Sequence, residues 1–203
     1  MRRVESLYWL IAVGLGGLAV WQALLLGDTQ SPLTPIVGLD FVPVYAGSRA
    51  VAAGLNPNDP NTIARILQEV GLSHFSSHNA YPASWGFLML PWSGMAFDKL
   101  SFVWRDFLLL ALVVSAPFCA WSSPMRRQSW GWVAAGLILW VWSQLWVTRL
   151  SLDLGQTNLV LVLSISAVLF MVARGWDRSA GVVLALGAAA KLLPGVMLFV
   201  ALL

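Results

Sequence analysis

Residues 107–121 read FLLLALVVSAPFCAW, and this stretch decides the class of fold. It contains no charged residue, and the apolar SFVW at 101–104 extends the segment backwards. A helix crosses the roughly 30 Å of bilayer hydrocarbon with about 20 apolar residues. The segment is therefore predicted to be a membrane span.

The composition of the whole chain agrees with this interpretation. Of 203 residues, 59% are hydrophobic and only 10% are charged. A water-soluble domain carries about 25% charged residues, so the soluble classes are excluded. The net charge of +3 is spread between the apolar segments, and we expect no nucleic-acid partner. The single cysteine, Cys119, rules out an intrachain disulfide and is expected to be a small apolar residue of a helix.

Four further segments are predicted to cross the membrane, which gives about five spans in a single transmembrane domain over residues 1–203. They are 8–26, 130–147, 159–173 and the segment from Gly181 to Leu203. The predicted fold class is therefore all-α, a polytopic helical bundle surrounded by membrane lipids. Tryptophans at the ends of several segments fit anchoring at the membrane interface.

The segment 81–97, YPASWGFLMLPWSGMAF, is apolar but short, and prolines and glycines interrupt it. Three arginine pairs indicate whether this segment crosses the membrane. They are Arg2 with Arg3, Arg126 with Arg127, and Arg174 with Arg178. All three fall on one side of the membrane only if 81–97 does not cross, and positive charge favours the cytoplasmic side. We therefore expect an embedded, non-spanning helix, a cytoplasmic N-terminus and a large outer loop over 27–103.

The outer loop is predicted to contain short helices that lie along the membrane surface. Residues 41–55 place small and apolar side chains at near-helical spacing, and NPNDP at 56–60 is a turn signal. Residues 61–72 form a second amphipathic pattern, for which Asn61 is the expected N-cap. A long loop with helices of its own is typical of a functional segment.

Four segments, taken in order, resemble one protein family. They are DFVPVYAGSRAVAAGLNPND (40–59), YPASWGFLMLPW (81–92), LGQTNLVLVLSISAVLF (154–170) and AGVVLALGAAAKLLPGVMLF (180–199). Together they resemble the polyprenyl-phosphate-sugar-dependent integral membrane glycosyltransferases of the GT-C fold. Within that fold they are nearest to glycosyltransferase family 87 (DUF2029), which contains the mycobacterial-type α-1,2-mannosyltransferases.

The chain departs from the family pattern in two positions and in length. Ala83 stands where the family usually has a second proline, and Asn58 stands where it usually has a tyrosine. Family members are roughly double this length, so the chain resembles their N-terminal half. A second chain that supplies the remaining C-terminal helices is therefore a candidate partner.

The resemblance implies an inverting transfer of a hexose, mannose in the nearest members, from a polyprenyl-phosphate donor to an acceptor hydroxyl of a glycan or glycolipid. It places the reaction at the outer, periplasmic face of the bacterial inner (plasma) membrane. An acid in the first outer loop is the catalytic base, and Asp40 aligns with it. A phosphate leaving group needs no general acid, whereas the attacking hydroxyl needs a carboxylate to take its proton. By position alone, Asp40 could instead be a turn or capping residue.

Cationic and amide side chains are the candidates for holding the phosphate and the sugar. The candidate substrate-binding residues are Lys191, Arg149, Gln156, Asn158, Arg49 and Tyr45. Lys191 lies well inside the fifth apolar segment, where a lysine costs about 3 kcal/mol on insertion scales. Structural roles are the alternatives. Lys191 can extend to the membrane interface, Arg149 can anchor a span and Asn158 can cap a helix.

No cofactor is expected, and the sequence favours a metal-independent reaction. Asp40 has no neighbouring carboxylate with which to hold a metal, and Asp59 reads as a turn residue. His74 and His78 have a zinc-compatible spacing of four residues but no evident third ligand. Asp153, in a second outer loop over 148–158, could assist the reaction or bind a metal.

Two other functions compete with glycosyl transfer. In a transporter or channel subunit, Lys191 and the outer loop would line a permeation path. Transporters commonly carry internal repeats, and this sequence shows none. The chain could also be the inactive half of a split glycosyltransferase.

Overall fold

The computed structural model describes residues 10–18, 39–75, 83–122, 130–145, 148, 151–152 and 154–190. All regular elements in these stretches are helices, which confirms the all-α class. The elements are η1 (Leu39–Phe41), α2 (Val42–Ala52), α3 (Pro60–Glu69), α4 (Ala83–Leu88), η2 (Leu90–Trp92), α5 (Phe97–Ser122), α6 (Trp130–Gln144), α8 (Asn158–Ala173) and α9 (Asp177–Ala190). Residues 10–18 are helical as well.

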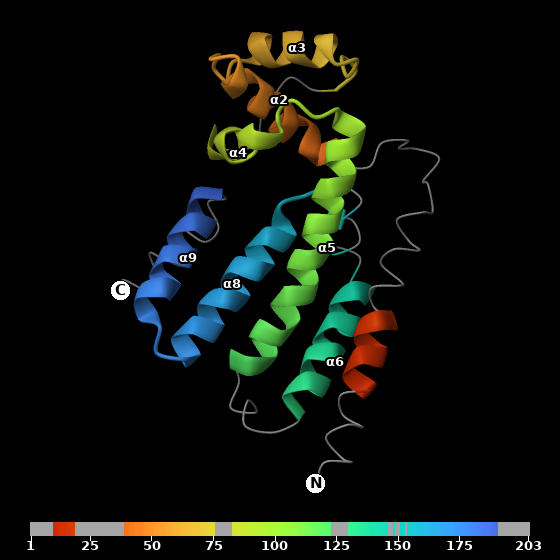
Figure 1. The fold of residues 1–203 in the computed structure, drawn as a ribbon, viewed down its shortest axis with the longest axis vertical. Helices are drawn as coiled ribbons and strands as arrows, with labels where there is room; N and C mark the ends of the chain where they lie inside the picture. The colour runs from red at the N-terminus through yellow and green to blue at the C-terminus, as the bar shows by residue number, and fades with distance from the viewer. Residues whose placement is uncertain are drawn as a thin grey trace.

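The helices form two parts, which we call the bundle and the cap (Figure 1). The bundle contains residues 10–18, α5, α6, α8 and α9, with α5 packed on α6 and α8, and α8 packed on α9. The cap contains η1, α2, α3, α4 and η2, and it lies over one end of the bundle. The first turns of α5 extend into the cap, so this helix connects the two parts.

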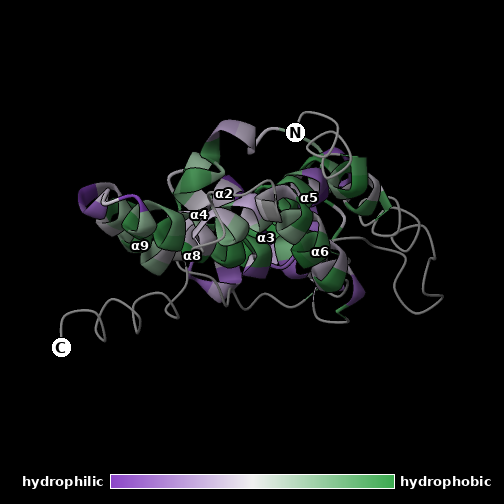
Figure 2. Ribbon diagram, turned by 90° about the horizontal axis from the view of Figure 1, so that it is seen from below, coloured by the Kyte–Doolittle hydropathy of each residue, from purple (hydrophilic) through white to green (hydrophobic). Residues whose placement is uncertain are grey.

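Helix α5 is long and apolar enough to cross a membrane. Its 26 residues make it about 39 Å long at 1.5 Å per residue, which exceeds the thickness of bilayer hydrocarbon. Among the described residues it is the one helix long and apolar enough to cross, while α8 is apolar but shorter. The number of spans therefore stays a prediction. Figure 2, seen from the end of the bundle opposite the cap, shows that hydrophobic residues dominate the bundle helices.

Small residues allow the bundle helices to approach closely. A methyl group at Gly136 of α6 would lie 3.0 Å from the carbonyl oxygen of Ala12, so glycine is needed where residues 10–18 cross α6. In α5 the buried Ser115 hydroxyl donates to the Ala111 carbonyl oxygen at 2.6 Å. The polar atoms of such helices are thus satisfied within the helix, as an apolar surrounding requires.

The cap has its own core. Helix α2 is almost wholly buried, and α3 turns Ile63, Ile66 and Leu67 inward. Helices α2 and α4 cross so closely that a methyl group at Gly86 would lie 3.1 Å from the Gly47 carbonyl oxygen. The helices predicted within 41–55 and 61–72 are therefore present as α2 and α3, and α2 packs against both α3 and α4.

Two boundaries differ from the sequence prediction. The N-cap of α3 is Asp59 and not Asn61, because the Asp59 carboxylate accepts from the Asn61 and Thr62 backbone N–H groups at 3.3 and 3.0 Å. Residues 81–97 are not a single helix, since the described part consists of α4, η2 and the start of α5. Pro91 explains the interruption, because proline disfavours helical geometry in the preceding residue and lacks an N–H group. Neither α4 nor η2 is long enough to cross a bilayer.

The Asp59 cap makes α3 sensitive to acid. Hydrogen bonds from the Thr62 hydroxyl and backbone lower the pKa of Asp59. A lowered pKa means that the stabilisation is present above the ordinary aspartate pKa and is lost as pH falls through the lowered value. Replacing Asp59 with Ala is expected to speed amide hydrogen exchange in α3 several-fold at neutral pH and to remove this pH dependence. Glu69→Gln is the control, and equal exchange in all three proteins would contradict the assignment.

Candidate active site

Asp40 lies at the junction between the cap and the bundle. It occupies η1, directly before α2, and its side chain is half-buried. Its backbone N–H donates to the Leu154 carbonyl oxygen at 2.8 Å, which ties η1 to the turn before α8. Phe41 is fully buried and stacks on Trp104 of α5, with ring centroids 5.0 Å apart. The backbone at Asp40 is therefore fixed from both sides.

The Asp40 side chain bonds to a residue 116 positions away in the sequence. Gln156 Nε2 donates to Asp40 Oδ2 at 2.6 Å. An ionised carboxylate has only acceptor atoms, so the amide must present its NH₂ group to it. The structure thus brings the catalytic candidate and one of the binding candidates into direct contact.

Gln156 is held in turn by its neighbours. Asn158 Nδ2 donates to Gln156 Oε1 at 2.7 Å, and the Gln156 backbone N–H donates to the Ser151 carbonyl oxygen at 2.8 Å. Ser151 Oγ lies 3.4 Å from both Gln156 Oε1 and Asn158 Nδ2. Both ends of the amide are engaged, so its orientation is fixed. Asp40, Gln156, Asn158 and Ser151 are called the Asp40 cluster below.

A tight turn at Gly155 presents Gln156 to Asp40. Gly155 has φ +69°, a left-handed conformation that glycine adopts without strain. Its carbonyl oxygen accepts a hydrogen bond from Trp104 Nε1 at 2.8 Å. Because Trp104 belongs to α5, that helix positions both the turn and, through Phe41, the segment that carries Asp40.

The Asp40 cluster lies level with a change of polarity along α5. Arg105 and Asp106 directly follow Trp104, and no charged residue occurs from 107 to 122. Trp104 contacts both chain segments of the cluster, so the cluster lies beside the last charged turn of the helix. If the uncharged part of α5 spans the hydrocarbon, the carboxylate lies at the boundary where lipid tails and a polar molecule can both approach.

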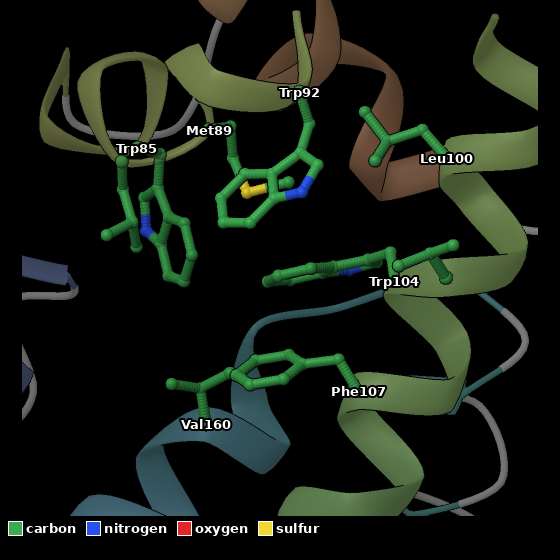
Figure 3. A pocket seen from close by; sticks show the side chains of 9 residues that line it. Trp85, Met89, Trp92, Leu100, Trp104, Phe107 and Val160 are labelled. Atoms are coloured by element: carbon green, nitrogen blue, oxygen red, sulfur yellow. The ribbon is translucent and has the colours of Figure 1, made fainter. Parts of the chain in front are cut away.

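Figure 3 shows an apolar cavity that is lined by Trp104, the residue whose Nε1 bonds to the turn before Gln156. It has a volume of about 320 Å³ and lies between α4, η2, α5 and the first turn of α8. Its walls are Trp85, Leu88, Met89, Trp92, Leu100, Val103, Trp104, Phe107 and Val160. Trp104 belongs to both sites, because its ring lines the cavity while its Nε1 bonds to the turn that holds Gln156. Such a lining suits a hydrocarbon chain.

Comparison with known proteins identifies the family. The sequence model of glycosyltransferase family 87 matches residues 79–203, which is more than half of the chain. The chain belongs to glycosyltransferase family 87. No curated protein and no solved structure matches it.

The GT87 match covers most of the site but begins after Asp40. It contains the cavity residues and Gln156, whose hydrogen bond joins Asp40 to the matched segment. Members of family 87 are membrane glycosyltransferases, and the length and apolar composition of α5 agree with that. The family assignment thus makes this protein a glycosyltransferase, while the roles of single residues rest on the geometry.

Two of the predicted binding residues of this GT87 chain lie in a separate network. The Tyr45 side chain is only 1% exposed, and its hydroxyl donates to the Met95 carbonyl oxygen at 3.0 Å. Arg49 Nη1 donates to the Tyr45 hydroxyl at 2.6 Å. These bonds join α2 to the turn after η2 and do not extend to the Asp40 cluster. Tyr45 therefore has a structural contact inside the cap.

Other predicted residues lie outside the described part of the chain. They are Lys191, Arg149, Asp153 and His78, and their roles stay predictions. Ala189, two positions before Lys191, accepts a hydrogen bond from Ser84 Oγ at 2.9 Å. The last described turn of α9 therefore contacts α4, at the end of the bundle that faces the cap.

Three site residues were missed by sequence reasoning. Trp104 was assigned only to a span, although a tryptophan beside Arg105 at the start of an uncharged run is a signal for the membrane interface. Ser151 carries no local signal, since its contacts depend on the turn. Thr157 Oγ1 is buried and has no hydrogen-bond partner within the part of the chain that the structure describes. A buried hydroxyl without a protein partner usually forms its hydrogen bond with water or a ligand.

Proposed function

We propose that the chain carries the catalytic base of an inverting membrane glycosyltransferase. The transferred sugar is a hexose, mannose being the first to test, and it moves from a polyprenyl-phosphate donor to a hydroxyl of a glycan or glycolipid acceptor. The supporting observation is a carboxylate oriented by a neutral amide, at the polarity boundary of α5 and beside an apolar cavity. A lipid-linked sugar donor requires that combination, because its two halves have opposite solubility.

Asp40 is the proposed base. Gln156 engages Asp40 Oδ2, so Oδ1 is the oxygen that accepts the proton of the acceptor hydroxyl. The acceptor oxygen forms a bond to the anomeric carbon while the bond from that carbon to the phosphate oxygen breaks, and the electron pair leaves with the phosphate. A single displacement of this kind inverts the anomeric centre. The phosphate leaves without a general acid, and we propose that the reaction uses no metal ion.

The cavity is the proposed site for the first isoprene units of the donor. Its volume of about 320 Å³ lies within the range of ordinary ligand pockets. Trp104 separates the cavity from the turn of Gln156, so a lipid in the cavity would have its phosphate near the Asp40 cluster. Apolar contact of this kind stabilises bound hydrocarbon by about 25 cal/mol per Å² of buried area.

Cations are needed to hold the departing phosphate, and Lys191 and Arg149 are the proposed residues. Asn158 is the proposed contact for sugar hydroxyls, because it belongs to the cluster and follows Thr157, whose buried hydroxyl has no partner among the residues that the structure describes. The NH₂ group of Gln156 already serves Asp40, so its contribution to binding would come through the position of the carboxylate. Helices from a second chain would complete the site.

The proposed location is the outer, periplasmic face of the bacterial inner membrane, with the N-terminus in the cytoplasm. Arg174 and Arg178 follow α8 at the end opposite the Asp40 cluster. The positive-inside rule favours the cytoplasm for that end, which leaves Asp40 on the other side.

The stereochemical course of the reaction tests the proposal. Native membranes that contain the chain would receive polyprenyl-phosphate mannose labelled in the sugar, and linkage-specific mannosidases would report the anomeric configuration of the product. The expected product has the configuration opposite to that of the donor. Retention of configuration would contradict a single displacement by Asp40.

The lipid cavity gives a second expected result. Val103 lines the cavity and is 50% exposed, so a tryptophan can enter this position without disturbing the core. Val103→Trp is expected to raise the donor KM about tenfold, which corresponds to about 1.4 kcal/mol of lost binding, and to leave the acceptor KM unchanged. The measurement is a donor titration at saturating acceptor.

Phe102→Trp is the matched control for that titration. Phe102 is the adjacent residue, is 52% exposed and does not line the cavity. Equal donor KM values for both variants would place the lipid elsewhere.

A further inference from the structure

A second hollow lies on the outer side of the cap, away from the apolar cavity. It has a volume of about 440 Å³ and is bounded by α2, α3 and the turn after η2. Its polar lining consists of Arg49, Arg65, Glu69, Ser93 and the backbone of Gly94. We call it the arginine pocket. Two arginines from different helices, Arg49 of α2 and Arg65 of α3, line it.

Arg49 is arranged in advance for binding. Its Nη1 donates to the Tyr45 hydroxyl at 2.6 Å, and that hydroxyl donates to the Met95 carbonyl oxygen at 3.0 Å. Since Tyr45 is buried, the chain of hydrogen bonds fixes one nitrogen of the guanidinium to the cap. The partner is a neutral phenol, so the positive charge is not neutralised, and the guanidinium keeps further N–H groups with which to bind a ligand. A side chain that is already ordered loses less entropy when a ligand binds.

Arg65 completes the pair from α3. Its side chain is exposed, and within the described stretches neither arginine forms an ion pair. Glu69, one turn further along α3, contributes a carboxylate to the same wall. Asp59 is also close enough to Arg65 to interact with it electrostatically, but its carboxylate is bonded to Thr62 of its own helix and does not line the pocket. The walls of the pocket therefore carry two guanidinium groups and one carboxylate, an excess of positive charge.

We propose that the arginine pocket binds an oxyanion, a phosphate or carboxylate group of a ligand that approaches from the aqueous side. Guanidinium groups bind such groups through paired N–H donors, and a site with two of them is selective for oxyanions over chloride. Glu69 would accept a hydrogen bond from a hydroxyl beside the anionic group.

The position suggests which ligand this is. Asp40 lies two residues before α2 and Arg49 lies in the last turn of that helix, so nine residues, or about 14 Å of helix, separate them. An anionic glycan or glycolipid acceptor could occupy the pocket while a sugar hydroxyl further along it meets Asp40. This last step rests on the proposed transferase function, whereas the oxyanion site does not.

Arginine labelling tests the site without an activity assay. The full chain in maltoside micelles would be treated with phenylglyoxal, with inorganic phosphate or with chloride at equal ionic strength, and labelling would be read by mass spectrometry. At a phosphate concentration about four times its Kd, labelling of Arg49 and Arg65 is expected to slow about fivefold, because the free fraction falls as 1/(1 + [L]/Kd). Arg178, exposed at the opposite end of the bundle, should be unaffected.

Variants of the pocket sharpen the result. Arg65→Ala is expected to abolish phosphate protection at Arg49, Arg65→Lys to weaken it and Gln68→Ala, a neighbouring exposed position, to preserve it. Arg65 is exposed, so its replacement leaves the fold intact, which circular dichroism would verify. Equal labelling with phosphate and chloride, or unchanged protection of Arg49 in Arg65→Ala, would overturn the proposal.

Nanodiscs distinguish the two sources of phosphate. Protection in phosphatidylglycerol discs without added phosphate would assign the pocket to a lipid headgroup. Protection that needs added phosphate in phosphatidylcholine discs would assign it to a soluble group. The labelling experiments measure oxyanion binding and not sugar transfer. The oxyanion proposal and the transferase proposal can therefore be contradicted independently of each other.

Discussion

Replacing Asp40 with Asn is expected to lower the rate of sugar transfer by about 10²- to 10⁴-fold. The amide has nearly the same shape and can still face Gln156, but it cannot accept the proton of the attacking hydroxyl. The donor KM should stay nearly constant, because the apolar cavity is untouched. The measurement is transfer of labelled sugar from polyprenyl phosphate in native membranes, normalised to the amount of folded chain.

Asp59→Asn is the matched control for this loss. It makes the same chemical change in the same cap, and asparagine caps a helix about as well as aspartate. Its activity should equal that of the unchanged protein. Full activity of Asp40→Asn would rule out Asp40 as the base and would favour the alternative role of a turn or capping residue.

Replacing Gln156 is expected to have the second largest effect. Gln156→Ala removes the donor that holds Asp40 Oδ2, so the carboxylate is no longer fixed. A misplacement of about 1 Å at a reacting group can cost about 100-fold in rate. The expected result is a loss of about 10- to 100-fold in kcat with little change in either KM.

Gln156→Glu separates positioning from simple loss of structure. It places a second carboxylate where the amide was, and two carboxylates at hydrogen-bond distance must share a proton. The pH profile of kcat should therefore change shape, which an unspecific packing defect would not produce. Gln68→Ala on α3 is the control, and an unchanged profile in Gln156→Glu would exclude a role for this residue at Asp40.

The sequence predicted the helical class and much of the cap. Apolar runs indicated the bundle helices, and the amphipathic pattern of 61–72 indicated α3, whose buried face is Ile63, Ile66 and Leu67. Local chemistry also led to errors of detail. Two polar residues, Asp59 and Asn61, flank Pro60 and could cap α3, and only the geometry selects Asp59, whose carboxylate accepts from the first N–H groups of the helix.

The candidate site was predictable only as separate parts. Asp40 and Gln156 were each identified in the sequence, but their contact spans 116 positions and depends on how η1 meets the turn at Gly155. No local pattern encodes that contact. Trp104 stacks on Phe41 and bonds to Gly155, and the Asp40 N–H bonds to Leu154, so both contacts hold the two segments together.

The continuity of α5 has a consequence for the surroundings in which the protein works. One helix carries both the uncharged segment and Trp104, so where that segment spans the bilayer, its depth also sets the height of the site above the bilayer centre. The uncharged residues 107–122 are about 24 Å long at 1.5 Å per residue, and a segment shorter than the hydrocarbon is accommodated by local thinning of the bilayer or by flanking side chains that extend to the interface. Thickening or thinning the bilayer would therefore raise or lower Trp104 together with the carboxylate beside it. Membrane thickness would in this way tune how deeply the reacting sugar sits among the lipid headgroups.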